Sequence, residues 1–262
     1  IFETPRPDGR ISILGGGPIT FARWMGYGVI ALYFLPIKKT YFLRFSFIIL
    51  FLIYCVVSGS RGPFTILLLI FMLYFFLNFK KIFFRFSILF SIIIAVFLFS
   101  NISKDISELG RTDRVFLNVA KKGGSNQSTQ TRYELAHRSL NLIKSYPFGI
   151  GAGNWQEIAN RYDSTHLMAH EYPHNLILEI MNEYGVFAGI LFLLFILHVS
   201  YSAYAKMKNN THVNSLYPFL FYLWIFLLLN AMLSGSLDDS RLLFITSCSI
   251  LVNSPLTLKK DE

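Results

Sequence analysis

Long apolar runs recur along this chain, and their length limits what it can fold into. Several approach the roughly 20 residues that a helix needs to cross a bilayer, and short basic or turn-rich connections separate them. Of the 262 residues, 53% are hydrophobic and 27 are Phe, a composition too apolar for an ordinary soluble domain. The sequence therefore predicts an all-α fold, a polytopic helical membrane protein.

About seven transmembrane helices are predicted from these runs. Their expected ranges are 18–36, 41–57, 64–77, 82–99, 175–201, 216–233 and 242–252. The last run is short, so it either borrows flanking residues or does not fully cross. The chain then divides into transmembrane helices at 1–100, one large loop at 101–173, and transmembrane helices with a tail at 174–262.

The formal net charge of +9 is explained by orientation in a membrane and does not indicate a nucleic-acid partner. Basic residues gather in short connections, among them Lys80 with Lys81 and Lys206 with Lys208. The positive-inside rule places such connections in the cytoplasm, whereas long loops cross regardless of charge. We therefore expect the loop on the outer face, the N-terminus out and the C-terminus in.

The large loop is the place where such a protein can hold chemistry. Within it, residues 130–144 predict an amphipathic helix that carries Arg132, because apolar side chains recur there at helical spacing: Leu135, Leu140 and Ile143. A turn rich in Pro and Gly follows at 146–155. The loop ends at Pro173-His174-Asn175, where the next apolar run begins.

Two arginines could bind an anion. Arg61 stands between two predicted spans, and Gly62 and Pro63 after it open a helix. Free N–H groups at a helix start, the positive end of the helix dipole and a guanidinium together suit a phosphate. The alternative is an arginine that snorkels to lipid headgroups. Arg132 is either a phosphate ligand on the loop helix or a solvated charge paired with an acid such as Glu134.

His174 is singled out by its position after a proline at the membrane surface. We expect it to start a helix, with Asn175, Glu179 and Glu183 on one stripe. Polar groups at such a place usually face the bundle or an aqueous cavity. A histidine there can act as a general base near neutral pH. The alternative is a histidine that caps or hydrogen-bonds the loop.

The stretch from His170 to His174 also matches H-E-x-x-H, a zinc signature that needs both histidines on one helical face. Pro173 would interrupt that helix, so we expect no metal site and no cofactor. An intramembrane metalloprotease stays a remote alternative. A polysaccharide transporter or flippase is another, although it would be expected to carry its charges inside the spans.

Several of these stretches, taken in order, resemble the O-antigen ligase and polymerase family. They are Ser60-Arg61-Gly62, Arg132 with the turn Pro147-Phe-Gly-Ile-Gly-Ala-Gly153, His174-Asn175 with Gly185 downstream, and Ser234 to Arg241. The resemblance covers essentially the whole chain, as the C-terminal portion of a longer protein. Because the chain begins at Ile1 without an initiator Met, we expect an N-terminal portion to precede it.

The resemblance implies a metal-independent glycosyltransferase of the GT-C type. Such an enzyme crosses the bacterial inner (cytoplasmic) membrane several times, with its active site on the periplasmic face. The implied donor is an undecaprenyl-pyrophosphate-linked glycan, and the implied acceptor is lipid A-core, in lipopolysaccharide biosynthesis, or a growing glycan. The resemblance also implies that Arg61 and Arg132 bind the pyrophosphate and that His174 activates the acceptor hydroxyl.

Further substrate-binding candidates are Arg138, Asn175 and Glu183. Arg138 stands ahead of a glycine in the loop at a spacing that resembles polymerases of the same superfamily. Three residues beyond Gly185, where the ligase pattern has Gly, Thr or Tyr, this chain has Ala188. O-antigen ligase is the expected function, and an O-antigen polymerase or a protein O-oligosaccharyltransferase of the same family stays open.

Overall fold

The computed structural model describes residues 17–36, 41–78, 127–163, 172–209 and 215–252. The chain forms two compact units, 1–124 and 125–262. Helices make up the regular structure of the described residues, which confirms the predicted all-α class. The predicted span at 82–99 lies outside the described residues.

Three packed helices form the described part of the first unit: α1 (Pro18–Phe34), α2 (Tyr41–Val57) and α3 (Arg61–Leu77). Their bounds match the first three predicted spans closely, although α3 begins earlier than expected, at Arg61. On α2, the Arg44 side chain donates hydrogen bonds from Nε to Leu32 O (2.9 Å) and from a terminal nitrogen to Leu35 O (3.0 Å). Arg44 thereby satisfies carbonyls that the end of α1 leaves without a helical partner.

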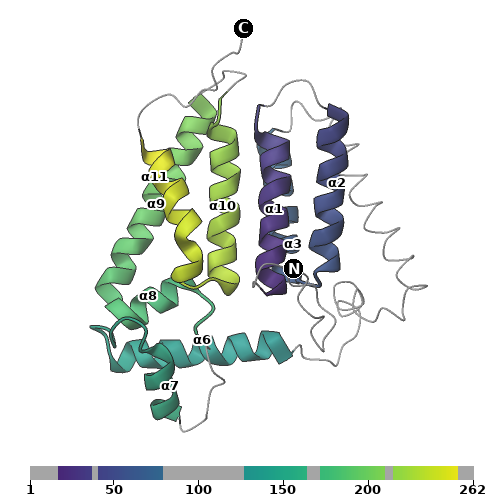
Figure 1. Ribbon diagram of the computed structural model, residues 1–262. Helices are drawn as coiled ribbons and strands as arrows, with labels where there is room; N and C mark the ends of the chain where they lie inside the picture. Colours follow the sequence, from purple (N-terminus) through teal and green to yellow (C-terminus); the bar gives the residue numbers. More distant parts are fainter. Residues whose placement is uncertain (1–16, 37–40, 79–126, 164–171, 210–214, 253–262) are drawn as a thin grey trace, which may run out of the picture. The chain divides into compact units, whose positions relative to one another are not determined.

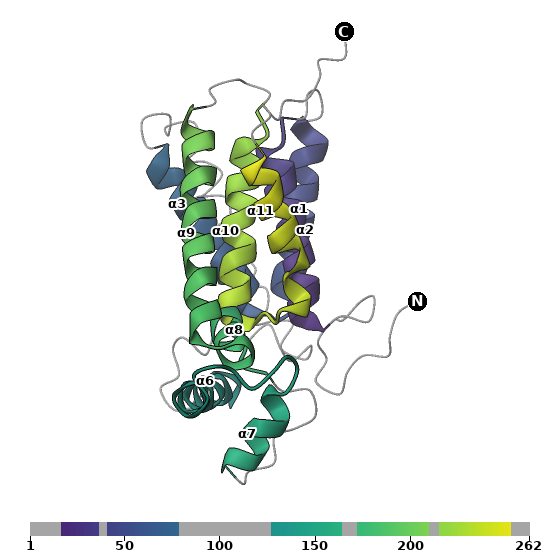
Figure 2. The same cartoon turned by 90° about the vertical axis from the view of Figure 1, so that its left-hand side faces the viewer.

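The second unit contains the remaining described elements. They are α6 (Gln127–Ser145), α7 (Trp155–Asp163), α8 (Leu176–Tyr184), α9 (Val186–Asn209), α10 (Tyr217–Ser234), the 3₁₀ turn η4 (Asp238–Ser240) and α11 (Arg241–Leu251). Within this unit, α9, α10 and α11 stand side by side, α8 lies at one end of them, and α6 runs crosswise beyond α8 (Figures 1 and 2).

Two helices of this unit, α9 with 24 residues and α10 with 18, are long and apolar enough to cross a membrane. In contrast, α11 has 11 residues, a length of roughly 16 Å against a hydrocarbon core of about 30 Å. As far as it is described, α11 therefore does not cross fully. Lys206, near the end of α9, donates hydrogen bonds to Ile250 O (2.6 Å) and Val252 O (2.7 Å) and holds the end of α11.

One predicted span is wrong in its continuity. The run 175–201 is not a single helix, because α8 ends at Tyr184 and α9 begins at Val186. Gly185 between them has φ of 91°, a conformation that favours glycine. On α9, a Cβ at Gly189 would lie 2.2 Å from Cγ of Met181, so α8 folds back closely onto α9.

Candidate functional site

The segment before α8 is not helical, and it places His174 differently from the prediction. His174 has φ of 55°, in the left-handed region where a non-glycine residue is uncommon. Asn175 is the N-cap, and its Oδ1 accepts a hydrogen bond from Leu178 N at 3.1 Å. The helix therefore begins at Leu176, and His174 precedes it instead of starting it.

Two hydrogen bonds join this segment to the end of α10. The Tyr172 hydroxyl donates a hydrogen bond to Ser234 O at 3.1 Å, and Asn175 Nδ2 donates one to Met232 O at 3.0 Å. The Tyr172 ring also lies against the His174 imidazole, with 4.1 Å between the ring centroids and 51° between the planes. Since the last carbonyls of a helix lack helical partners, the end of α10 offers acceptors for both hydrogen bonds.

Glu179, on the first turns of α8, is buried, with 8% of its surface exposed. Its Oε2 accepts a hydrogen bond from Leu237 N at 3.0 Å, in the turn between α10 and η4. Helix α8 lies outside the two helices of this unit that are long and apolar enough to cross a membrane. Burial raises the pKa of Glu179 to about 7, and the hydrogen bond from Leu237 N–H acts in the opposite direction. Repulsion from three nearby carboxylates raises the pKa further: Glu183, Asp238 and Asp239.

Glu183, one turn further along α8, is also buried, at 9% exposed. Burial raises its pKa, as does Asp238, while a hydrogen bond from the Gly153 backbone lowers it. The predicted stripe of Glu179 and Glu183 on one side of α8 is thus present. Glu179 binds the turn after α10, and Glu183 binds the glycine-rich turn between α6 and α7.

The glycine-rich turn docks on the end of α8 through backbone atoms. Ile150 N donates to Asn182 O at 2.8 Å, Gly151 N to Glu183 O at 3.0 Å, and Val186 N to Pro147 O at 2.9 Å. The approach is close: a Cβ at Gly149, where φ is 94°, would lie 2.6 Å from Glu183 O, and one at Gly185 would lie 2.8 Å from the Phe148 carbonyl carbon. Gly149 in the turn and Gly185 after α8 therefore lie on the two sides of one close backbone contact, which we call the glycine joint.

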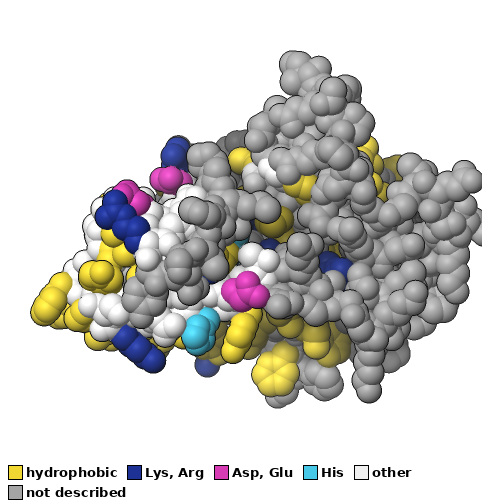
Figure 3. Space-filling model, turned by 90° about the horizontal axis from the view of Figure 1, so that it is seen from below, with side chains coloured by type: hydrophobic (Ala, Val, Ile, Leu, Met, Phe, Trp, Pro, Cys, Tyr) yellow, Lys and Arg dark blue, Asp and Glu magenta, His cyan; other side chains and the backbone are white. Residues whose placement is uncertain are grey.

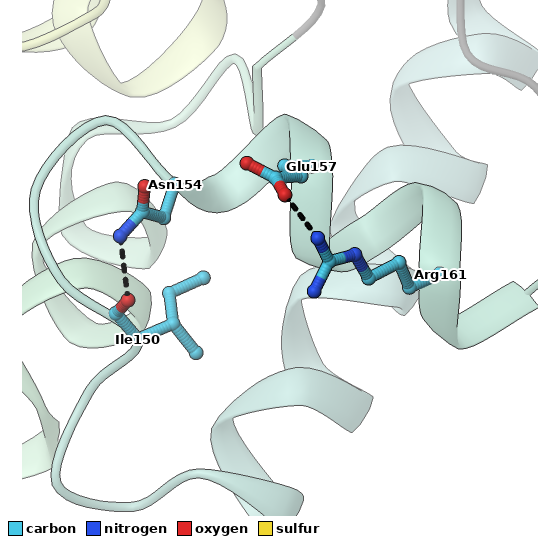
Figure 4. A network of polar contacts seen from close by, with 4 residues as sticks. All are labelled: Ile150, Asn154, Glu157 and Arg161. Carbon is cyan, nitrogen blue, oxygen red and sulfur yellow. Dashed lines mark hydrogen bonds and ion pairs between the residues drawn. The ribbon is translucent and has the colours of Figure 1, made fainter.

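Figure 4 shows how the same turn leads into α7. Asn154 Nδ2 donates a hydrogen bond to Ile150 O at 3.0 Å, and Glu157 pairs with Arg161 on the exposed side of α7. A buried apolar cluster joins α6 to α7: Leu135, Leu142, Trp155 and Ala159. The predicted apolar side of α6 included Leu140, and this part of the prediction was wrong, because Leu140 is 49% exposed. Leu142 belongs to the cluster instead.

The predicted arginines lie in two places. Arg132 and Arg138 are half-buried on α6, the helix that packs against α8. Seen from the side of α6 and α7, charged and hydrophobic side chains share the surface of this unit (Figure 3). Arg61 belongs to the first unit, where it is half-buried at the first residue of α3, after Ser60 as the N-cap. It therefore stands at a helix start, as the sequence predicted.

The zinc-like stretch is only partly described. His170 and Glu171 lie outside the described residues, and His174 precedes α8 with a left-handed backbone. Within the described ranges, no group of three or more His, Cys, Asp or Glu could hold a metal ion.

Some residues of this site were missed by the sequence analysis. The ring of Tyr172 contacts His174. The backbone N–H of Leu237, in the turn after α10, donates a hydrogen bond to Glu179. Tyr172 could have been found by its place two residues before His174. A backbone donor such as Leu237 N–H leaves no sequence signal, because every residue except proline has one.

A family model described as O-antigen ligase matches residues 45–193, more than half of the chain. The matched region contains α8 with His174 before it, the glycine-rich turn, and the three candidate arginines Arg61, Arg132 and Arg138. No curated protein matches the chain.

Proposed function

Because the chain belongs to the O-antigen ligase family, we propose that it transfers a glycan from undecaprenyl pyrophosphate to an acceptor hydroxyl, with His174 as general base. The acceptor that we propose is lipid A-core. The observation that supports this most is the placement of His174: it precedes α8 with a left-handed backbone, at the end of a bundle with two helices long and apolar enough to cross a membrane. A lipid-linked donor presents its pyrophosphate at that depth.

The proposed reaction is a single displacement. The neutral His174 imidazole accepts the proton of the acceptor hydroxyl, and the oxygen forms a bond to the anomeric carbon of the glycan. The bond between that carbon and the pyrophosphate oxygen breaks, and undecaprenyl pyrophosphate leaves with the electron pair. A positioned base of this kind contributes on the order of 10²- to 10⁴-fold in rate.

The arginines provide the charge that the leaving group needs. We propose that Arg132 binds the pyrophosphate, because it lies on α6, which packs against the helix that follows His174. Arg61 at the start of α3 is the second proposed ligand, and Arg138 on α6 is a third. A guanidinium can bind phosphate oxygens with two parallel hydrogen bonds. Charge growing on the leaving group would then be stabilised without a divalent metal.

Asn175 and Glu183 have a different place in this proposal. Both side-chain groups of Asn175 bind the backbone of the protein, and Glu183 is buried beneath the glycine-rich turn. We propose that they shape the substrate site by holding α8 and that they contact substrate less directly than the arginines do.

The test is glycan transfer in cells that carry single variants of the full-length protein at matched expression. His174→Ala should lower transfer by about 10²-fold or more while donor binding to the purified protein is largely kept. The matched control is His137→Ala, an exposed histidine of α6 that contacts only Asn141 among the hydrogen bonds described for it. Transfer at the parental rate in His174→Ala would contradict the proposed base.

The arginines are tested by a conservative change. Arg132→Lys keeps the charge but loses the paired hydrogen bonds, so donor binding and transfer should both fall. Arg161→Lys is the control, because Arg161 is exposed on α7 and pairs with Glu157. Equal effects of the two substitutions would contradict a donor-binding role of Arg132.

One residue favours a second acceptor. Ala188 stands where the ligase pattern has Gly, Thr or Tyr, so a growing glycan, as in a polymerase, is the alternative. The two reactions differ in their products. A ligase leaves the glycan length unchanged and attaches it to lipid A-core, whereas a polymerase lengthens the lipid-linked glycan.

A further inference from the structure

The turn between α6 and α7 carries an aromatic ring that the protein does not cover. Phe148 is 95% exposed, although burial of a phenyl ring is strongly favoured in water. Its neighbour Pro147 accepts a hydrogen bond from Val186 N at 2.9 Å, and Val186 is the first residue of α9. Phe148 is therefore held at the level where α9 begins.

The exposed side of α9 is mostly apolar from that point onward, although His198 is exposed as well. Its large apolar side chains that are more than 45% exposed are Phe187, Ile190, Leu191, Leu194, Leu197 and Tyr201. On a helix long and apolar enough to cross a bilayer, such a surface faces lipid tails. Phe187 opens this surface at 74% exposed, immediately after the joint that holds Phe148.

The residues around Phe148 are of the types that favour the boundary between lipid and water. Tyr146 is 45% exposed and Tyr184 is 49% exposed, and tyrosine is enriched at the level of the lipid headgroups. Lys144, exposed at the end of α6, can extend its ammonium to headgroup phosphates. The rings and the lysine come from both sides of the joint between Gly149 and Gly185.

We propose that the turn 146–149 is a membrane anchor, in which Phe148 inserts into the interfacial layer of the lipid bilayer beside the start of α9. The occupant is lipid because the turn continues the lipid-facing surface of α9. The glycine joint makes the anchor rigid, since its backbones are too close for any side chain at Gly149 or Gly185. The anchor fixes the height of α6, and with it Arg132, above the bilayer.

This inference requires that α9 crosses the bilayer, and it does not depend on the transfer reaction. Its test is spectroscopic, on the full chain reconstituted in vesicles of phosphatidylcholine with some phosphatidylglycerol. Phe148→Trp places an indole at the anchor, and phospholipids brominated near the headgroup quench indoles at that depth. The signals of Trp24, Trp155 and Trp224 are subtracted with the parental protein.

We expect headgroup-brominated lipid to quench the added indole strongly, as in Phe187→Trp at the start of α9. Glu157→Trp on the exposed side of α7 is the control that should show little quenching. Quenching in Phe148→Trp no stronger than in Glu157→Trp would overturn the membrane anchor and would favour a protein partner for this surface.

A second measurement uses chemical labelling in the same vesicles. Phe148→Cys should react with a membrane-impermeant maleimide much more slowly than Glu157→Cys, and equal rates would also overturn the membrane anchor.

Discussion

The ring of Tyr172 lies against the imidazole of His174, with 4.1 Å between their centroids, while the tyrosine hydroxyl donates a hydrogen bond to Ser234 O. The tyrosine thus contacts the proposed base with one end and the last turn of α10 with the other. Any tilt of α10 relative to α8 would move the ring, so the orientation of the imidazole depends on the packing of these two helices.

Tyr172 should therefore position His174 without taking part in proton transfer. Tyr172→Phe keeps the ring and loses one hydrogen bond, which is worth about 0.5–1.5 kcal/mol, so it should retain most of the transfer rate. Tyr172→Leu loses the ring face and should lower kcat more than it raises KM. The measurement is transfer by purified protein over a range of donor concentrations. Equal kcat in the two variants would show that the ring is not needed.

The fold could be read from the sequence wherever a signal was local. Apolar length predicted α1, α2 and α10 almost to the residue. The same signal failed at 175–201. The helix is interrupted at Gly185, where the backbone of Phe148 packs closely, and the apolar character of the run gives no information about that contact. The glycine-rich stretch 146–155 predicted a turn, but not that this turn meets Gly185, because that contact joins backbones far apart in sequence.

The glycine joint gives a prediction with a built-in control. Gly149→Ala should destabilise the protein strongly, because φ is 94° and the new Cβ would meet Glu183 O at 2.6 Å. Gly153→Ala, with φ of 73° and nothing within 4 Å of its Cβ, should cost only the left-handed backbone strain, about 1–2 kcal/mol. Thermal unfolding in detergent compares the two. A Gly149→Ala midpoint at or above that of Gly153→Ala would contradict the close joint.

Asn175 should act on stability through two separable hydrogen bonds. Asn175→Asp keeps the oxygen that caps α8 and loses the donor to Met232 O, whereas Asn175→Ala loses both. Loss of an N-cap costs about 0.5–2 kcal/mol, so the alanine variant should unfold at a lower temperature than the aspartate variant. Amide hydrogen exchange at Leu178 should increase only in the alanine variant. An increase of the same size in both would contradict a capping role.

The candidate site was predictable in its side chains and not in its geometry. His174 and the buried pair Glu179 and Glu183 stood out because polar residues at the start of an apolar run are expensive unless they are used. The sequence does not indicate that His174 precedes the helix with a left-handed backbone. The partners of Asn175 and Glu179 after α10 are backbone atoms, which are chemically the same at nearly every position.

Glu179 should make the stability of the second unit depend on pH. Burial raises its pKa to about 7 from 4.5, so between these values the folded protein binds a proton that the unfolded chain has lost. Its contribution to the free energy of unfolding is full below about pH 4.5 and is lost as the pH rises through about 7. Glu179→Gln keeps an acceptor for Leu237 N–H without the charge, so relative to the parent it should gain stability from about pH 5 to about pH 8. Thermal unfolding in detergent measures this, with the exposed Glu157→Gln as the control that keeps the parental slope. Identical slopes for the parent and Glu179→Gln would show that the buried carboxyl does not titrate in this range.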